Sequence, residues 1–311
     1  MLKVFIPERM IDQRIDVALS EMLPEYSRSR VAAWIKSGDA LINNKTFKPK
    51  DKVIGNETVL LKLTQKDNNH WRPEKLNLNI LFEDDDIIII NKPSGLVTHP
   101  GAGNWSGTLA NALLYYDSNL SNIDRAGIVH RLDKNTSGLM VVAKNIKSQK
   151  FLVEQLQTHS VEREYSAIVY GHMISGGTIN EPIGRDSKDR VKQTVMANGK
   201  EAITHYRAID RFKSHTHVKA ILETGRTHQI RVHLSYLGHP LIGDPTYGGR
   251  VRFPKKASQE LKDGLINCQR QALHSKKLTL THPGTGKSMT WKKDLPDDMQ
   301  ELLNILKRYD S

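Results

Sequence analysis

Residues 127–143 read GIVHRLDKNTSGLMVVA, and this stretch says more about the fold than any other part of the chain. Two apolar segments, each typical of a buried strand, enclose a polar loop in which Asp133 lies between Arg131 and Lys134. A carboxylate beside positive charge stays ionised at neutral pH, so Asp133 is available as a nucleophile or a base. The alternative is structural, because an Asp in a turn often hydrogen-bonds its own backbone. These residues alone leave both interpretations open.

Strands and helices alternate on both sides of this stretch. The apolar residues 87–90 and 164–170 are predicted as buried strands. Helices are predicted to begin at Ser148 and at Thr227, and Gly238 lies where the second of these should end. Such mixing predicts one α+β or α/β domain in the larger part of the chain, although the pattern does not give the order of the strands.

The N-terminal part has a different pattern, with two short amphipathic helices and a small β unit. Apolar residues recur at helical spacing over 11–22, and Pro24 is expected to end that helix. A second helix is expected after the basic segment 27–30, with Gly38 as a left-handed residue beyond its end. The predicted division is an N-terminal domain at 1–65, a polar linker at 66–75 and a larger domain at 76–311.

The charge of the chain favours a polyanionic partner. Its 311 residues include 46 Lys and Arg against 34 Asp and Glu, a formal net charge of +12 with a pI near 9.6. The longest strongly apolar run, residues 87–90, is far shorter than the ~20 residues that span a bilayer, so no membrane is expected as a partner. The N-terminus has no secretory signal, and the single cysteine, Cys268, cannot form an internal disulfide. We therefore expect a cytoplasmic protein, and a monomer because nothing in the sequence suggests a dimer seam.

Other kinds of site fail on spacing. The segment 284–288, GTGKS, looks like the end of a P-loop, but that motif needs a glycine where this chain has a threonine. Gly107 is one residue too late to complete a dinucleotide-binding loop. His228 and His233 are five residues apart, which does not place both on one helical face to bind zinc. The acidic run 83–86 is expected to be a solvated turn rather than a metal site.

With its flanks, the stretch around Asp133 resembles the signature of the RluA family of RNA pseudouridine synthases. In that family His-Arg-Leu-Asp, followed by a Thr-Ser/Thr-Gly turn, holds the catalytic Asp, here Asp133. The chain departs from the pattern at Asn135, where an acidic residue is usual. Two later segments are similar to the same family. REYSAIVYG at 163–171 would present the active-site Tyr, here Tyr165, and GRTHQIRVH at 225–233 is similar to the segment whose first Arg pairs with the catalytic Asp, here Arg226.

The resemblance implies that uridine in RNA is isomerised to pseudouridine, in which the N1–C1′ bond is broken and the uracil is rejoined through C5. The base must leave the stack before that bond can be reached. Asp133 would then attack C1′ or remove a proton from C2′, two routes that the sequence does not distinguish. Arg226 would keep Asp133 ionised, Tyr165 would stack on the base, and Arg131 would fill the gap left by the flipped base. No cofactor and no metal are implied.

Residues 1–65 resemble the S4 RNA-binding fold, in the segments RID at 14–16, SRSR at 27–30 and KSG at 36–38. In that family the second helix presents basic residues to the RNA backbone, so Arg28, Arg30 and Lys36 are expected to contact phosphates. The alternative is that they merely solvate the helix. Together the resemblances predict an α+β protein with a small S4-like α/β RNA-binding domain. A larger domain of pseudouridine synthase type would follow, with a mixed, mainly antiparallel sheet.

The substrate is predicted from three further matches, at 247–250, 254–258 and 270–274. They are most similar to the branch of the family that modifies a stem-loop of large-subunit (23S) ribosomal RNA, which is therefore the expected partner. Other ribosomal sites, transfer RNA and a pre-ribosomal particle stay open as substrates. A non-catalytic RNA-binding protein on the same scaffold also stays open.

Overall fold

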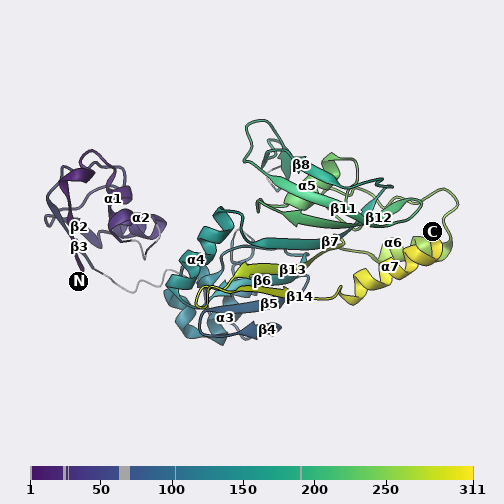
Figure 1. Ribbon diagram of the computed structural model, residues 1–311, viewed down its shortest axis with the longest axis horizontal. Helices are drawn as coiled ribbons and strands as arrows, with labels where there is room; N and C mark the ends of the chain where they lie inside the picture. The colour runs from purple at the N-terminus through teal and green to yellow at the C-terminus, as the bar shows by residue number, and fades with distance from the viewer. Residues whose placement is uncertain are drawn as a thin grey trace. The chain divides into compact units, whose positions relative to one another are not determined.

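The computed structural model describes residues 2–23, 26, 28–62, 71–101, 103–189 and 191–310, without the side chains of Ser29 and Arg30. The chain divides into two compact units, residues 1–70 and 71–311 (Figure 1). The predicted helix end at Pro24, the hydroxyl of Ser27 and residues 66–70 of the predicted linker lie outside the described residues.

The first unit is a three-stranded antiparallel sheet with two helices, in the strand order β1-β3-β2. The first predicted helix starts later than expected, because Asp12 has a positive φ of 65° and a short 3-10 helix precedes it. Gly38 is left-handed as predicted, with a φ of +76°. The elements are β1 (Leu2–Ile6), a 3-10 helix (Glu8–Met10), α1 (Ile15–Met22), α2 (Arg28–Ser37), β2 (Ala40–Ile42) and β3 (Glu57–Leu61).

The second unit is built on one large sheet in the order β4-β5-β6-β13-β7-β12-β11-β8, with β14 also paired to β13. All neighbouring strands are antiparallel except β6 and β13, which run parallel, so the predicted mixed and mainly antiparallel sheet is confirmed. Its strands are β4 (Ile80–Glu83), β5 (Ile87–Lys92), β6 (Ser137–Ala143), β7 (Glu162–Tyr170), β8 (Gly177–Asn180), β11 (Ile203–Arg211), β12 (His215–Leu222), β13 (Leu273–Thr281) and β14 (Ser288–Lys292).

Strand β5 shows why its sequence is uniformly apolar. Successive side chains of a strand point to opposite faces of the sheet. Ile88 and Ile90 pack in the core that includes Leu109 of α3 (Leu109–Tyr116). Ile87 and Ile89 pack on the other face with Leu152 of α4 (Ile146–Gln157). A strand covered on both faces has no solvent side, so the alternation of polar and apolar residues disappears.

The remaining elements cover this sheet and edge it. They are α3 (Leu109–Tyr116), two 3-10 helices (Ser118–Asn122 and Asp124–Gly127), α4 (Ile146–Gln157), the hairpin β9 (Ile183–Arg185) and β10 (Gln193–Val195), α5 (Gln229–Tyr236), α6 (Gln259–Asn267) and α7 (Asp297–Tyr309). Among the described residues, none of these helices combines the length and the apolar character needed to cross a membrane.

Two helix starts differ from the prediction. The side chain of Asn145, not Ser148, caps α4, because the Ser148 backbone N–H donates to Asn145 while the Ser148 hydroxyl donates to Asp86. At α5 the hydroxyl of Thr227 makes no cap, and the Gln229 side chain accepts from the backbone N–H of Arg226 instead.

The strand predicted before Asp133 is also wrong. Arg125, Ala126 and Gly127 have left-handed φ values of 56°, 53° and 77°, which no strand can contain. Ile128 makes only an isolated bridge to Val142. Gly127 is required in this turn, because a Cβ there would lie 1.9 Å from the Ala143 carbonyl oxygen.

Candidate active site

The loop before β6 that carries Asp133 is fastened through its backbone. Every carbonyl from residue 132 to 135 accepts a hydrogen bond. Thr98 Oγ1 donates to the Leu132 carbonyl at 2.8 Å, and Lys92 Nζ donates to the Lys134 carbonyl at 3.1 Å. A side chain on so constrained a loop is held in one place, as a catalytic group requires.

Lys92, at the end of β5, is fully buried beneath this loop. Its amine donates to three carbonyls, those of Pro93, Leu96 and Lys134, at 2.9, 2.9 and 3.1 Å. Burial lowers the pKa of Lys92 to about 7, although the negative charge of Asp133 opposes the shift. The protonation of the group that anchors the loop therefore changes near neutral pH.

Arg231, not Arg226, is the arginine that pairs with Asp133. Arg231 Nη1 lies 3.0 Å from Asp133 Oδ2. Arg226 donates instead to the Glu201 carbonyl at 2.8 Å, and within the described part of the chain Asp133 forms no ion pair with Arg226, Arg131 or Lys134. The reason is the helix start, because Arg231 lies in the first turn of α5 and Arg226 in the preceding loop.

Arg231 is itself held by a second carboxylate that the sequence analysis missed. Its Nε and Nη2 form a two-pronged pair with Asp244, at 2.7 and 2.9 Å. Burial by itself would raise the pKa of Asp244, but the hydrogen bonds and charge of Arg231 outweigh it and lower that pKa. Burial also opposes the charge of Arg231, and the two carboxylates outweigh it and raise the pKa of the guanidinium. The pair remains ionised and aims Arg231 at Asp133.

His228 is a second basic neighbour of Asp133, and it is linked in turn to Tyr247. His228 Nε2 lies 3.9 Å from Asp133 Oδ2, and its Nδ1 is 2.9 Å from the Tyr247 hydroxyl. That hydroxyl already accepts from the backbone N–H of Gln193 at 2.9 Å, so its own proton is free to point at His228 Nδ1. When that proton is donated, His228 is the tautomer with its N–H on Nε2, which faces Asp133. Burial lowers the pKa of His228, although the charge of Asp133 opposes the shift.

Tyr165 projects from β7 into the same region and is only 5% exposed. Burial raises the pKa of its hydroxyl, which therefore keeps its proton at neutral pH. The ring lines the same pocket as Asp133.

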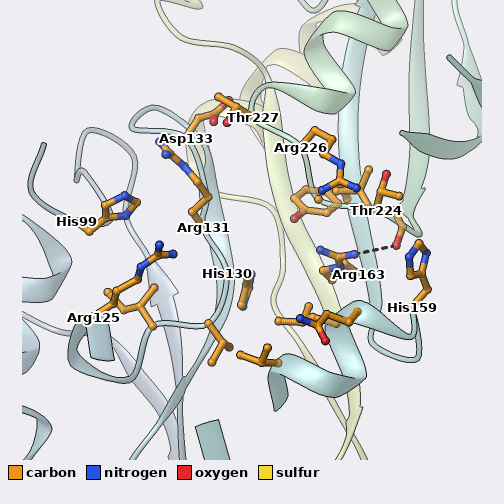
Figure 2. Close-up of a pocket in the computed structure, with 18 residues that line it drawn as sticks. His99, Arg125, His130, Arg131, Asp133, His159, Arg163, Thr224, Arg226 and Thr227 are labelled. Carbon is orange, nitrogen blue, oxygen red and sulfur yellow. Dashed lines mark hydrogen bonds between the residues drawn. The ribbon is translucent and has the colours of Figure 1, made fainter. Parts of the chain in front are cut away.

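This pocket brings together four of the predicted residues, Arg131, Asp133, Tyr165 and Arg226 (Figure 2). Its volume is about 470 Å³, and it runs from the Asp133 loop past β7 to the end of α4. Asp133 is the only acid among the described residues that line it. The arginines that line it are Arg125, Arg131, Arg163 and Arg226. The pocket is therefore strongly basic and suited to an anionic ligand.

The predicted phosphate contacts of the first unit lie on α2. The Arg28 guanidinium pairs with the buried Asp16 at 3.0 Å, and about half of the Arg28 side chain remains exposed. Lys36 is exposed in the last turn. The side chain of Arg30 lies outside the described residues.

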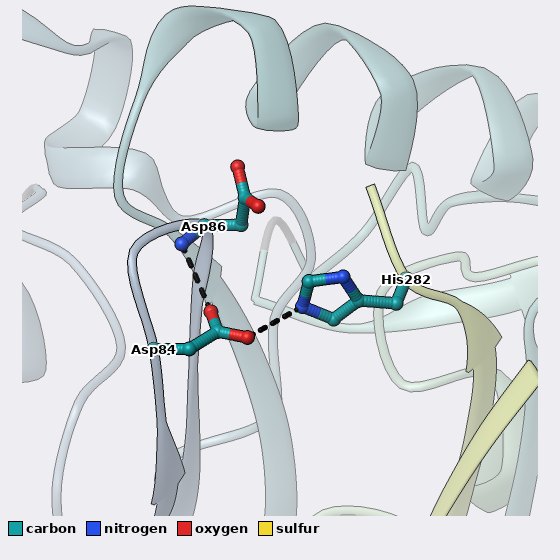
Figure 3. Close-up of side chains that lie close together, drawn as sticks. All are labelled: Asp84, Asp86 and His282. Carbon is teal, nitrogen blue, oxygen red and sulfur yellow. Dashed lines mark hydrogen bonds and ion pairs between the residues drawn. The ribbon is translucent and has the colours of Figure 1, made fainter. Parts of the chain in front are cut away.

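Asp84, Asp86 and His282 also lie close together, with one ligand-type atom of each within 4.8 Å of the others (Figure 3). Both nitrogens of His282 are already used. Nε2 is 2.7 Å from Asp84, and Nδ1 accepts from the backbone N–H groups of Gly284 and Thr285. Asp86 accepts from Ser148 on α4. The cluster fastens the turn between β4 and β5 to α4 and to the hairpin between β13 and β14.

A fastened carboxylate in a basic pocket, with a buried tyrosine beside it, is typical of an enzyme that acts on nucleic acid rather than a module that only binds it. Residues 86–236 match the family described as RNA pseudouridylate synthase. The chain belongs to this family, and it is a pseudouridine synthase.

Full-length relatives agree with this family. Each of three is called Ribosomal large subunit pseudouridine synthase D. The Yersinia pestis protein is 50% identical over 98% of this chain and 94% of its own length. The Escherichia coli K12 protein is 49% identical with the same coverage, and the Xanthomonas campestris protein is 48% identical over 97% of this chain and 91% of its own.

Solved structures give the same fold. Human RNA Pseudouridylate Synthase Domain Containing 4 is 27% identical, with a TM-score of 0.57 over 75% of this chain and 94% of its own. Human RNA Pseudouridylate Synthase Domain Containing 1 is 24% identical, with a TM-score of 0.54 over 74% of this chain and 95% of its own, and shows the fold alone.

Proposed function

We propose that this enzyme isomerises specific uridines in large-subunit ribosomal RNA, within a stem-loop of the 23S molecule. The observation that carries the chemistry is the ion pair between Asp133 and Arg231. Asp133 lines a basic pocket, and Tyr165 lines the same pocket. The substrate is inferred from the relatives, which are called ribosomal large subunit pseudouridine synthases and match over nearly their whole length.

Asp133 is proposed as the catalytic residue. Arg231 binds its Oδ2 and keeps the carboxylate charged, while Oδ1 is left for the substrate. Either Asp133 attacks C1′ as a nucleophile or it removes the C2′ proton. In both routes the electrons of the N1–C1′ bond leave with the uracil. A bond between C1′ and C5 then forms. In the first route it replaces the bond from C1′ to Asp133, whose carboxylate is released, and in the second route Asp133 returns the proton to C2′. C5 finally loses its proton and N1 gains one.

Tyr165, Arg131 and Arg226 are proposed to act on the flipped nucleotide. Tyr165 stacks against the uracil and, because its hydroxyl stays protonated, donates a hydrogen bond rather than accepting a proton at rest. Arg131 is exposed on the Asp133 loop, which suits it to fill the gap in the RNA stack. Arg226 binds RNA rather than Asp133, because its guanidinium lines the pocket and is tied to the Glu201 carbonyl.

Residues 1–65 are proposed to form an S4-like RNA-binding domain, joined by a linker at 66–75 to the catalytic domain at 76–311. Support comes from the two helices on a small sheet and from the basic residues of α2. Arg28, Arg30 and Lys36 would contact phosphates. We also propose that the enzyme acts as a cytoplasmic monomer, on free ribosomal RNA or an assembling subunit.

The central test is Asp133→Asn with a stem-loop RNA. We expect RNA affinity within a few-fold of the wild type and no pseudouridine, because the amide is nearly the same size but cannot act as a nucleophile or base. Turnover by the variant, after deamidation has been excluded by mass spectrometry, would contradict the role of Asp133.

The substrate is tested by mapping pseudouridines in the source organism with and without the gene. Loss of specific 23S sites, restored by the wild type and not by Asp133→Ala, is the expected result. An unchanged ribosomal map would overturn the ribosomal assignment and direct the search to transfer RNA.

A further inference from the structure

Arg163 is a buried cation without a counter-charge. It is 5% exposed on β7, and it forms no ion pair with any described carboxylate. Its Nη2 donates to the Glu223 carbonyl at 2.7 Å, whereas its Nε is buried without a partner among the described residues. Burial lowers the pKa of Arg163, although Tyr165 opposes the shift. Buried charges are costly unless they are paired, so this guanidinium is suited to meet an anion that arrives from outside.

The position of Arg163 connects it to the active site. It lines the pocket and lies two residues before Tyr165 on β7, so both side chains point to the same face of the strand. Two residues span about 7 Å along a strand. An anion at Arg163 would therefore lie beside the base that stacks on Tyr165, and not on it.

Arg125 approaches the same space from the opposite wall (Figure 2). It is presented by the left-handed turn at Arg125, Ala126 and Gly127, a conformation that is strained for the two residues that are not glycine. The Arg125 side chain is exposed and makes no hydrogen bond or ion pair with the described residues. This backbone conformation sets the wall from which the Arg125 side chain projects, and strain of this kind is concentrated at functional sites.

The wall at this end of the pocket also has apolar side chains, Ile128, Val153 and Leu156, beside the polar residues His130, Gln157 and His159. Apolar surface beside cations suits a nucleotide, whose base has an apolar face and whose phosphate is charged. A free carboxylate or a protein ligand would leave the apolar wall unused.

We propose that this end of the pocket is a second nucleotide subsite, in which Arg163 and Arg125 bind the backbone phosphate next to the target uridine. The inference rests on the proposed function, because it assigns the ligand to the RNA strand that enters the active site. Guanidinium groups suit the task, because their fork of N–H donors matches phosphate oxygens. Filling this subsite would hold the strand beside the flipped base.

The first experiment measures thermal unfolding of the full-length protein in sodium phosphate and in sodium chloride of equal ionic strength. Inorganic phosphate should raise the Tm of the wild type, because a ligand of the folded state stabilises it. Arg163→Met should abolish that rise without lowering the Tm in chloride, because an unpaired buried charge is removed. A variant that loses stability in chloride and keeps the phosphate response would overturn the proposal, since Arg163 would then be structural.

The second experiment measures binding of a stem-loop RNA at several salt concentrations with Arg125→Gln, and uses Lys213→Gln as a matched control. Lys213 is exposed between β11 and β12 and does not line the pocket. We expect Arg125→Gln to weaken binding about tenfold and to reduce the slope of log K against log salt by about one. Equal slopes in the two variants would overturn the proposal, even if Arg163→Met failed to fold.

The subsite and the enzymatic function can fail separately. A wild type that gains stability from phosphate but forms no pseudouridine in any RNA would contradict the proposed function. A wild type that modifies RNA but loses nothing on Arg125→Gln would contradict the subsite alone.

Discussion

Arg231 binds two carboxylates at once, Asp133 in the pocket and Asp244 in the core. Arg231→Lys keeps one charge but loses the planar fork, so a single ammonium cannot hold both partners. We expect kcat to fall at least about 100-fold, because Asp133 is no longer aimed. Steady-state kinetics on a stem-loop RNA would measure this, with KM changing much less.

Arg226→Gln is the matched comparison, because the same family segment contains both arginines. With Arg226 proposed to contact RNA, we expect KM to rise and kcat to stay within a few-fold of the wild type. If Arg226→Gln removed kcat while Arg231→Lys kept it, the pairing of Asp133 would have to change when RNA binds.

Lys92 gives a pH dependence of stability. Its pKa in the folded protein is about 7, below the ordinary value of 10.5, so the unfolded chain holds more protons over most of that interval. The free energy of unfolding should therefore rise with pH above about 7, by up to ~1.4 kcal/mol per pH unit from this group. The contribution levels off above the ordinary pKa.

Lys92→Met should remove this slope, which urea unfolding of both proteins between about pH 7 and pH 9 would measure. The difference between the two slopes isolates Lys92 from all other titrating groups. Parallel curves would mean that Lys92 does not change its protonation in this interval.

At the scale of elements, the close contact between β6 and β13 depends on Gly138. A Cβ at this position would lie 2.3 Å from the Ser275 carbonyl oxygen, and the φ of Gly138 is +114°. Gly138→Ala should cost at least about 3 kcal/mol of folding free energy, through strain and the forced separation of the strands. Chemical denaturation would measure the loss.

Gly286→Ala is the control, because Gly286 also has a positive φ, +67°, but a Cβ added there would meet no atom of the described residues within 4 Å. It should cost only about 1 kcal/mol. A similar loss in both variants would show that backbone strain alone, and not the contact with β13, limits position 138.

How far the sequence predicts the structure also depends on the scale. Sequence motifs predicted that Asp133 and Tyr165 belong to one site, and both residues line the same pocket. This prediction is possible because each motif is a contiguous segment that can be recognised without knowing the fold. The partner of Asp133 could not be predicted in this way, since Arg226 and Arg231 occur in the same segment and only the exact start of α5 decides which one faces it. Asp244 is separated from Arg231 by a turn, and no local pattern predicts that the two meet.

Helix caps failed for a related reason. Ser148 is a good capping residue by type, but Asn145 lies three residues earlier and Asp86 on another element takes the Ser148 hydroxyl. The order of the strands could not be predicted from the sequence pattern, because β13 pairs with β6 and β7, which lie more than 100 residues earlier in the chain.

At the scale of the whole molecule, the two units have separate cores. The apolar cluster of the first unit contains only residues up to 61, and the clusters of the second contain only residues from 71 onward. A chain that starts at residue 71 should therefore keep its fold and its melting transition. It should also bind the stem-loop RNA more weakly and with a smaller salt slope, because phosphate contacts of α2 are lost.

Circular dichroism and salt-dependent binding would measure both properties on the truncated and full-length chains. A truncated chain that does not fold would contradict independent units. One that folds and binds with the full-length affinity and salt slope would contradict an RNA-binding role for the first unit.

Strand β13 has a consequence for the synthesis of the protein. It fills the space between β6 and β7, whose loops and side chains form the pocket, yet it comes from residues 273–281 near the end of the chain. A nascent polypeptide therefore carries Asp133 and Tyr165 long before the strand that joins their halves of the sheet has been translated. The sheet that carries the pocket can therefore be complete only after residue 281 has been translated, and we expect a nascent chain that has not yet reached this residue to leave the RNA around it unmodified.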